Sequence, residues 1–149
     1  MRIATTFRRR LAAPRETVFR AVTDYDKLQE TFPHVFLSIR VLERSGSEVV
    51  TEEKLSVAGA TMTQLCRHRT RAPTTHAVEI LTGDLAGSRI LERYSSDADG
   101  GTTVRVEADF RVGGLLSLLP PFVVRPLVEG NVGRVFDELS AAVGAGATE

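Results

Sequence analysis

Apolar and polar residues alternate along most of this chain, with a period of two. Such alternation is typical of strands that bury one face and leave the other in water. Short clusters rich in Gly, Pro, Asp and Ser separate the alternating segments and favour turns. The pattern predicts strands at Arg2–Leu11, Val35–Glu43, Glu48–Val57, Thr61–Arg71, Thr74–Leu81, Arg89–Ser95 and Thr103–Val112.

Short connections link the strands from Val35 onward. Ala58–Gly59, for example, is expected to form the turn between two of them. Strands joined by short turns pair in antiparallel fashion, so the segment predicts a meander with one covered face. In its first strand we expect the buried face to consist of Val35, Leu37, Ile39 and Val41.

Two short helices are predicted between the first strand and the meander. Pro14 suits the first position of a helix, where no backbone donor is needed. Asp24 is then expected to cap a second helix, Tyr25–Thr31, through its carboxylate. Phe32–Pro33 ends this helix, because the residue before a proline avoids helical geometry.

The apolar period changes to three or four residues near the end of the chain. This period predicts a long amphipathic helix over Pro121–Val143, with Pro126 expected to bend it. Gly144–Glu149 is small and polar, and we expect a frayed tail there. The apolar stripe of the helix consists of Val128, Val132, Val135, Phe136, Leu139, Ala142 and Val143.

The order of these elements predicts a single α+β domain over residues 1–149. A twisted sheet of about seven strands curves, and a helix laid across its concave face rarely fills the groove. The space that remains is expected to be an apolar pocket with a few polar groups. We expect its walls to include Val106, Ala108 and Phe110 on the sheet and Val128, Val132 and Val135 on the helix.

Composition and charge narrow the class of partner. The 149 residues include 19 basic and 19 acidic side chains, so the net charge is zero, which argues against nucleic acid or an anionic membrane as partner. Cys66 is the only cysteine and fits a reducing compartment. Because no apolar segment is long enough for a signal peptide or a membrane span, we expect a cytoplasmic protein without stable membrane insertion. We expect it to be a monomer or a homodimer.

Several polar residues share the inward faces of the strands with apolar ones. Each taken alone is typical of a core residue paired with a neighbour, whereas together they resemble the polar groups of a small-molecule pocket. Glu52 and Glu53 point to opposite faces and are not expected to form an acid–base pair. The polar candidates for the pocket are Gln64, His68, His76, Glu92, Tyr94 and, on the helix, Asn131, and the apolar candidates on the same strand faces are Met62, Val78 and Ile90.

Motifs for metals, cofactors and nucleophiles do not occur. The spacing of the three histidines matches no zinc motif, although Cys66, His68 and His76 are expected to lie near one another. The sequence also contains no phosphate-binding loop, dinucleotide fingerprint or nucleophile elbow. We therefore expect neither a metal nor a cofactor.

Three segments resemble the START-like superfamily, and in particular its coenzyme Q-binding-protein and polyketide cyclase-like branch. They are LAAPRETVFRAVTDYDKLQETFPHV, GGTTVRVEADFRVGGLL and LVEGNVGRVFDELSAAV. The resemblance implies a helix-grip fold, in which the sheet wraps the long C-terminal helix and a hydrophobic ligand binds between them. Pro126 inside the helix and the lack of tryptophan depart from this branch, which implies a differently shaped pocket.

Two functions are compatible with these features. The first is a carrier or sequestering protein for a lipid, an isoprenoid quinone or a polyketide-like molecule, and the absence of a catalytic set favours it. The alternative is a polyketide cyclase or aromatase in which Glu92, Tyr94 or His76 acts as general acid or base. A ribosome-associating role, known for this fold, is disfavoured by the neutral charge.

Glycines and prolines cluster at the two segments where a ligand is expected to enter. A lipid cannot pass through a paired sheet, so it must pass between the helix and the loops. Glycine lowers the cost of backbone motion, and a proline in a helix removes a hydrogen bond. We therefore predict a gate between Gly113–Pro126 and the Gly83–Gly87 loop, with Val132–Val143 held in place.

Overall fold

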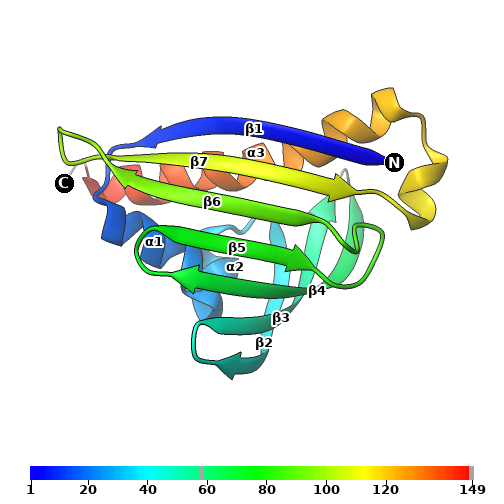
Figure 1. The fold of residues 1–149 in the computed structure, drawn as a ribbon, viewed down its shortest axis with the longest axis horizontal. Coiled ribbons are helices and arrows are strands. Elements are labelled where there is room, and N and C mark those ends of the chain that lie inside the picture. The colour runs from blue at the N-terminus through cyan, green and yellow to red at the C-terminus, as the bar shows by residue number, and fades with distance from the viewer. Residues whose placement is uncertain (58, 148–149) are drawn as a thin grey trace.

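A computed structural model describes residues 1–57 and 59–147 of the chain. Strands precede and follow two short helical segments, and a long helix ends the described part (Figure 1). The strands are β1 (Arg2–Leu11), β2 (Phe36–Ser45), β3 (Glu48–Val57), β4 (Ala60–Arg71), β5 (Thr75–Ile80), β6 (Arg89–Ser96) and β7 (Thr102–Arg111). The helices are α1 (Arg15–Thr23), α2 (Leu28–Thr31) and α3 (Pro121–Ala147), with 3₁₀ turns η1 (Tyr25–Lys27) and η2 (Gly114–Leu118).

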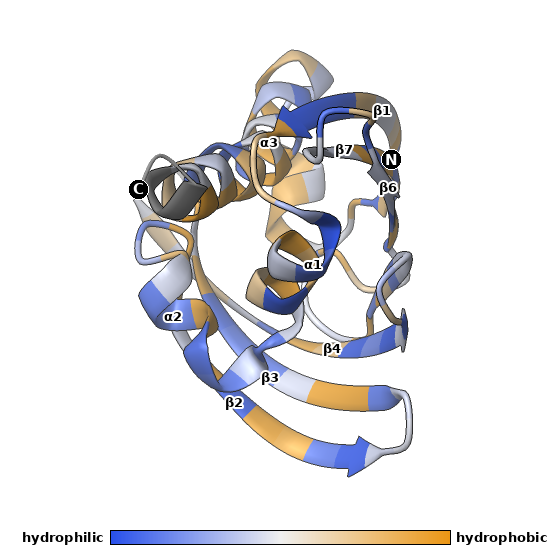
Figure 2. Ribbon diagram, turned by 90° about the vertical axis from the view of Figure 1, so that its left-hand side faces the viewer, coloured by the Kyte–Doolittle hydropathy of each residue, from blue (hydrophilic) through white to orange (hydrophobic). Residues whose placement is uncertain are grey.

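The strands of the described residues form one antiparallel sheet in the order β1-β7-β6-β5-β4-β3-β2. From β2 to β7 each strand pairs with the next one along the chain, as the short turns predicted. Strand β1 closes the other edge by pairing with β7, where Ile3 lies opposite Phe110. The sheet curves around α1 and α3 (Figure 2), which is the predicted α+β helix-grip arrangement.

Helix α3 packs its apolar stripe into the concave face of the sheet, except for Ala142, which is exposed. Val128, Phe136 and Leu139 are 4%, 1% and 0% exposed, and burying side chains of this size stabilises the fold by roughly 1.5–3 kcal/mol each. The stripe begins one turn earlier than predicted, at the fully buried Val124. The helix also continues to Ala147 rather than ending at Val143 before a frayed tail, and Pro126 lies inside it.

The predicted inward face of the second strand is wrong at one residue. Leu37 is 45% exposed, whereas Phe36 and Ile39 pack against the core. The pairing of β2 with β3 shifts register between Phe36 and Ser38. Because an extra residue in one strand reverses the side to which the following residues point, this irregularity turns Leu37 outward.

The two short helices differ from the prediction in their starts. Pro14 is the residue before α1 rather than its first residue, and Asp24 makes no side-chain capping bond. Instead the Asp24 backbone N–H donates to the Arg20 carbonyl, so this residue ends α1. The expected helix Tyr25–Thr31 is accordingly divided into the tight turn η1 and the short helix α2, and it ends before Phe32 as predicted.

Parts of two predicted features lie outside the described residues. These are Ala58 of the expected Ala58–Gly59 turn and the last two residues of the expected tail. Among the described residues, no helix is both long enough and apolar enough to cross a membrane.

Candidate functional site

A cavity of about 120 Å³ lies between the concave face of the sheet, the short helices and α3. Its walls are mostly apolar, and the polar side chains among them come from the central strands β3 to β6 and from α3. The predicted residues that line it are Met62, Gln64, His68, His76, Val78, Ile90, Glu92, Phe110, Val128, Asn131, Val132 and Val135.

Three predicted residues do not line this cavity. Val106 and Ala108 are buried on β7, between β1 and β6. Tyr94 is 2% exposed and packs edge-to-face on Phe19, with ring centroids 5.4 Å apart, so α1 covers it. All three side chains are buried, but they do not line the cavity.

Thr51 and Glu53 complete the polar part of the site, and the sequence prediction missed both. They are 0% and 4% exposed and point inward from β3, between the buried Val49 and Leu55. The same period of two that identified Gln64 and His68 places Glu53 on the inner face of its strand. The alternation of period two in β3 is therefore the sequence signal that identifies Glu53 as a site residue.

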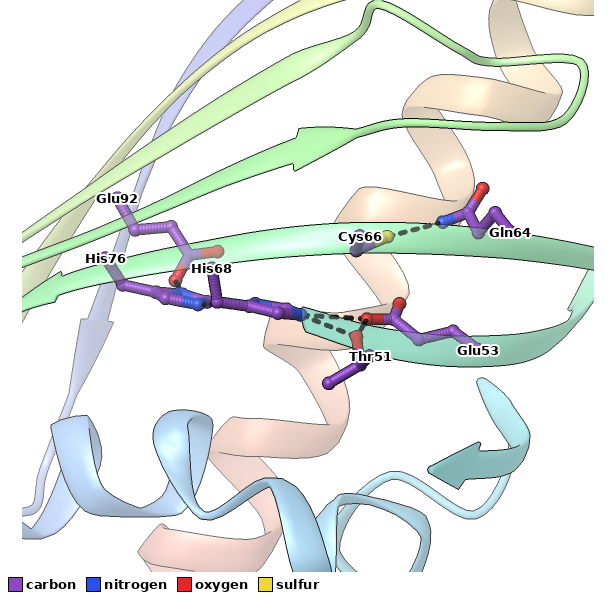
Figure 3. A network of polar contacts seen from close by, with 7 residues as sticks. All are labelled: Thr51, Glu53, Gln64, Cys66, His68, His76 and Glu92. Carbon is purple, nitrogen blue, oxygen red and sulfur yellow. Dashed lines mark hydrogen bonds and ion pairs between the residues drawn. The ribbon is translucent and has the colours of Figure 1, made fainter. Parts of the chain in front are cut away.

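These side chains form a continuous chain of hydrogen bonds across four strands (Figure 3). Glu53 Oε2 lies 2.9 Å from His68 Nε2, and Thr51 donates to the same carboxylate oxygen at 2.6 Å. His68 Nδ1 lies 3.0 Å from His76 Nε2, and His76 Nδ1 lies 2.8 Å from Glu92 Oε1. The Tyr94 hydroxyl donates to the same Glu92 oxygen at 2.6 Å.

The three hydrogen bonds of this chain use every ring nitrogen of the two histidines. In each bond one atom donates and the other accepts, so the donor and acceptor roles of the four side chains are linked.

Burial and hydrogen bonding act in opposite directions on the Glu53 carboxyl. Burial by itself raises its pKa, but the hydrogen bond and the charge of His68, together with the hydrogen bond from Thr51, outweigh burial and lower the pKa. Glu53 is therefore the ionised end of the chain, and His68 Nε2 donates to it. Burial and the neighbouring Glu92 raise the pKa of Tyr94, so its hydroxyl stays protonated and donates.

Tyr25 separates this polar chain from the solvent on the side of the helices. It is 4% exposed, and its ring lies 4.6 Å from that of His68 and 6.3 Å from that of His76. Burial and the charges of Glu92 and Glu53 raise the pKa of Tyr25. The short segment after α1 thus keeps water away from the two imidazoles.

The neighbouring thiol is unreactive. Cys66 is fully buried, and burial followed by the charge of Glu53 raises its pKa well above the ordinary value. Gln64 Nε2 donates to its sulfur at 3.5 Å. Within the described part of the chain, no group of three or more His, Cys, Asp and Glu side chains is placed to hold a metal ion.

Two amide oxygens in the cavity wall lack hydrogen-bond partners. Gln64 Oε1 on β4 and Asn131 Oδ1 on α3 are buried and unpaired among the described residues. A buried polar atom without a partner costs roughly 1–3 kcal/mol. A donor on a bound molecule would remove this cost, so the two amides mark positions for ligand hydroxyl or N–H groups.

The two segments of the predicted gate are in contact. The Gly113 N–H donates to the Asp84 carbonyl at 2.7 Å, and the Leu116 N–H donates to the Asp84 carboxylate at 3.2 Å. Leu85 and Leu116, one from each segment, line the cavity. Asp84 therefore connects the loop before β6 to η2 beside the cavity.

The fold and the cavity define the chain as a hydrophobic-ligand-binding domain of the helix-grip type. It belongs to the polyketide cyclase/dehydrase and lipid transport family, whose sequence profile matches residues 2–144. The predicted START-like, polyketide cyclase-like membership is thereby confirmed. A comparison with curated proteins gave no significant match.

Solved structures share the fold at low sequence identity. A protein from Thermus thermophilus superposes with a TM-score of 0.84 at 19% identity, covering 97% of this chain and 99% of that one. The Zhui aromatase/cyclase from a Streptomyces species superposes with a TM-score of 0.81 at 20% identity, covering 99% of this chain and 94% of that one. A START superfamily protein from Mycobacterium smegmatis superposes with a TM-score of 0.79 at 16% identity, covering 97% of both chains.

Proposed function

We propose that this protein binds a hydrophobic small molecule and carries or sequesters it in the cytoplasm. The observation that carries this proposal is a mostly apolar cavity whose imidazoles are already engaged. All four ring nitrogens of His68 and His76 have hydrogen-bond partners within the protein. A general base must reach the proton that it removes, and neither histidine has a nitrogen left for a ligand.

The dimensions of the cavity and its unpaired amides indicate the class of ligand. Cavities for drug-sized ligands measure about 300–1,000 Å³, whereas this one measures about 120 Å³. A lipid, quinone or polyketide-like molecule would therefore require the gate to open. Gln64 and Asn131 favour a ligand with an apolar body and one or two hydroxyl groups.

Two lipids that differ by a single hydroxyl provide the test. We expect 12-hydroxystearic acid to bind more tightly than stearic acid, because only the former can donate to Gln64 or Asn131 within the cavity. The paired substitution Gln64→Leu and Asn131→Leu should reduce this preference about tenfold, which corresponds to about 1.4 kcal/mol. Folding stability should change little, because the substitution removes two unpaired oxygens together with the weak Gln64–Cys66 hydrogen bond. Titration calorimetry measures the binding preference, and thermal melts measure the stability.

A matched control is Gln29→Leu, since Gln29 is exposed and bonds only to the Leu37 carbonyl. This variant should keep the hydroxyl preference. Native mass spectrometry of the purified protein, followed by organic extraction, would identify a ligand that copurifies. Failure of both lipids to bind at millimolar concentration, with no copurifying molecule, would refute the proposal.

A polyketide cyclase or aromatase is the second candidate, and one observation favours it. Glu92 lines the cavity and ends a hydrogen-bonded chain along which a proton can shift. In that case a poly-β-keto probe would be consumed by the protein, and Glu92→Gln would lower the rate about 100-fold or more. That outcome would show that the protein is a cyclase or aromatase rather than a carrier.

A further inference from the structure

The most exposed apolar side chains of the described residues are concentrated at one end of the molecule. Leu115, Leu118 and Phe122 are 77%, 78% and 79% exposed, and Leu119 between them is 39% exposed. The other exposed large apolar side chains of the described part reach at most 45%. We call Leu115, Leu118, Leu119 and Phe122 the apolar tip.

The apolar tip is built by the turn η2 and the start of α3. This segment protrudes beyond the ends of the strands, at the right-hand side of Figure 1. Leu116 and Leu127, from the same segment, face the other way and line the cavity. The tip therefore forms the outer side of the predicted gate, whose inner side is the cavity wall.

The segment that builds the tip carries little charge of its own. Between Gly113 and Val128 in sequence the only charged residue is Arg125, which pairs with Glu129 at 3.0 Å. The Asp84 carboxylate also lies against this segment, where it accepts from the Leu116 N–H. Moving the four side chains of the tip into an apolar medium would therefore bring only one ion pair and one hydrogen-bonded carboxylate near the lipid. This matters because the burial of unpaired charges is the largest cost of entering a lipid phase.

We propose that the apolar tip docks on the surface of a lipid bilayer, inserting its four side chains and bringing the gate to the membrane. The area favours this occupant over a second copy of the chain. The four side chains expose roughly 500 Å² in all, since a large aromatic side chain contributes about 150–250 Å² when buried. A stable protein interface needs about 800 Å² on each partner, but a few inserted side chains suffice for reversible membrane binding.

The chain contains no tryptophan, so a single introduced one reports on the tip alone. Phe122→Trp should show a blue-shifted emission when phosphatidylcholine vesicles are added, because its indole leaves water for the interface. Leu42→Trp is the matched control, since Leu42 is an exposed apolar residue on β2 at 45% exposure. Its emission should remain unchanged.

Vesicle cosedimentation measures the strength of docking. The triple substitution Leu115→Ser, Leu118→Ser and Phe122→Ser should lower the partition coefficient at least tenfold, while Leu37→Ser with Leu42→Ser should not change it. Because the tip is uncharged, binding should be the same in about 50 mM and about 500 mM salt and should not need anionic lipid. Thermal melts of both variants should match the wild type, because all substituted side chains are exposed.

Three outcomes would overturn the proposal. They are a wild-type protein that does not bind vesicles, docking that survives the triple substitution, and a self-association in solution that the triple substitution abolishes. The last would make the tip a dimer interface. None of these measurements uses a cavity ligand, so their failure is distinct from a failure of the proposed ligand binding.

Discussion

At the scale of single residues, the site depends on one buried carboxylate. Glu53 is 4% exposed and accepts hydrogen bonds from His68 and Thr51. Its charge requires that His68 donate through Nε2, which leaves Nδ1 of His68 facing His76. The ionised Glu53 on β3 is thus linked through both histidines to Glu92, on β6.

We predict that the folding stability of the protein falls in acid because of Glu53, and that Glu53→Gln removes this pH dependence. The pKa of Glu53 is lower in the folded protein than in an unfolded chain, where it is about 4.3. The contribution of ionised Glu53 to the free energy of unfolding is therefore fully present above about pH 4.3 and is lost as the pH falls through the lower pKa of the folded state. At pH 7, Glu53→Gln should cost about 1.5–3 kcal/mol of unfolding free energy, and in acid the difference from wild type should shrink. Urea denaturation at a series of pH values measures this.

The neighbouring Glu52→Gln is the control for this experiment. Glu52 is half-buried on the other face of β3 and pairs with Arg40 at 3.3 Å. A surface pair of this kind contributes about 0–1 kcal/mol, so the variant should remain close to wild type at every pH. A Glu53→Gln protein as stable as wild type at pH 7 would contradict the assignment of Glu53 as the ionised end.

At the scale of elements, the turn η2 is held by a contact that only glycine permits. Gly114 has φ of +56°, and a Cβ built there would overlap the Asp84 carboxylate oxygen. The same carboxylate accepts from the Leu116 N–H. The conformation of η2, and with it the position of the apolar tip, therefore depends on a close approach of two segments that are distant in sequence.

We expect Gly114→Ala to destabilise the protein by about 1–2 kcal/mol from its backbone conformation alone, with a further loss from displacement of Asp84. Gly130→Ala in α3 is the matched control. A Cβ there meets nothing within 4 Å, so alanine should stabilise the helix by about 0.5–1 kcal/mol. Denaturant titrations of the two variants should move in opposite directions; an unchanged Gly114→Ala protein would show that the Asp84 contact does not hold η2.

At the scale of the whole molecule, the two ends of α3 are secured differently. Phe136, Leu139 and Val143 are buried in the core, whereas the first turns carry exposed side chains. Asp84 on the loop before β6 bonds to η2, and Leu85 and Leu116 beside this contact line the cavity. Opening for a ligand is therefore expected at η2 and the first turn of α3, within Gly113–Pro126.

Hydrogen exchange of the ligand-free protein tests this division. The amides of Gly113–Pro126 and Gly83–Gly87 should exchange faster than those of Val132–Val143, because few buried contacts hold them. Asp84→Ala should accelerate exchange in both gate segments, whereas Asp26→Ala should not, since Asp26 pairs with Arg44 on the surface. Uniform protection along α3 that Asp84→Ala leaves unchanged would rule out the gate.

The sequence by itself determined the order of elements and the inward side of most strands. Alternation of period two and a helical period depend only on local geometry, so they are readable without knowledge of the neighbours. The inward positions of Gln64, His68, His76 and Glu92 follow from this period. The inward position of Glu53 follows from the same period in β3, where it alternates with the outward Glu52.

Only the tertiary structure decided which inward side chains meet one another and which meet a cavity. Tyr94 packs on Phe19 of α1 and Val106 is buried on β7, and neither lines the cavity despite pointing inward. The pairing of Glu53 with His68 likewise depends on the register between β3 and β4. The exposure of Leu37 depends on an irregularity in the pairing of β2 with β3. These features depend on contacts between distant segments, which a local period does not contain.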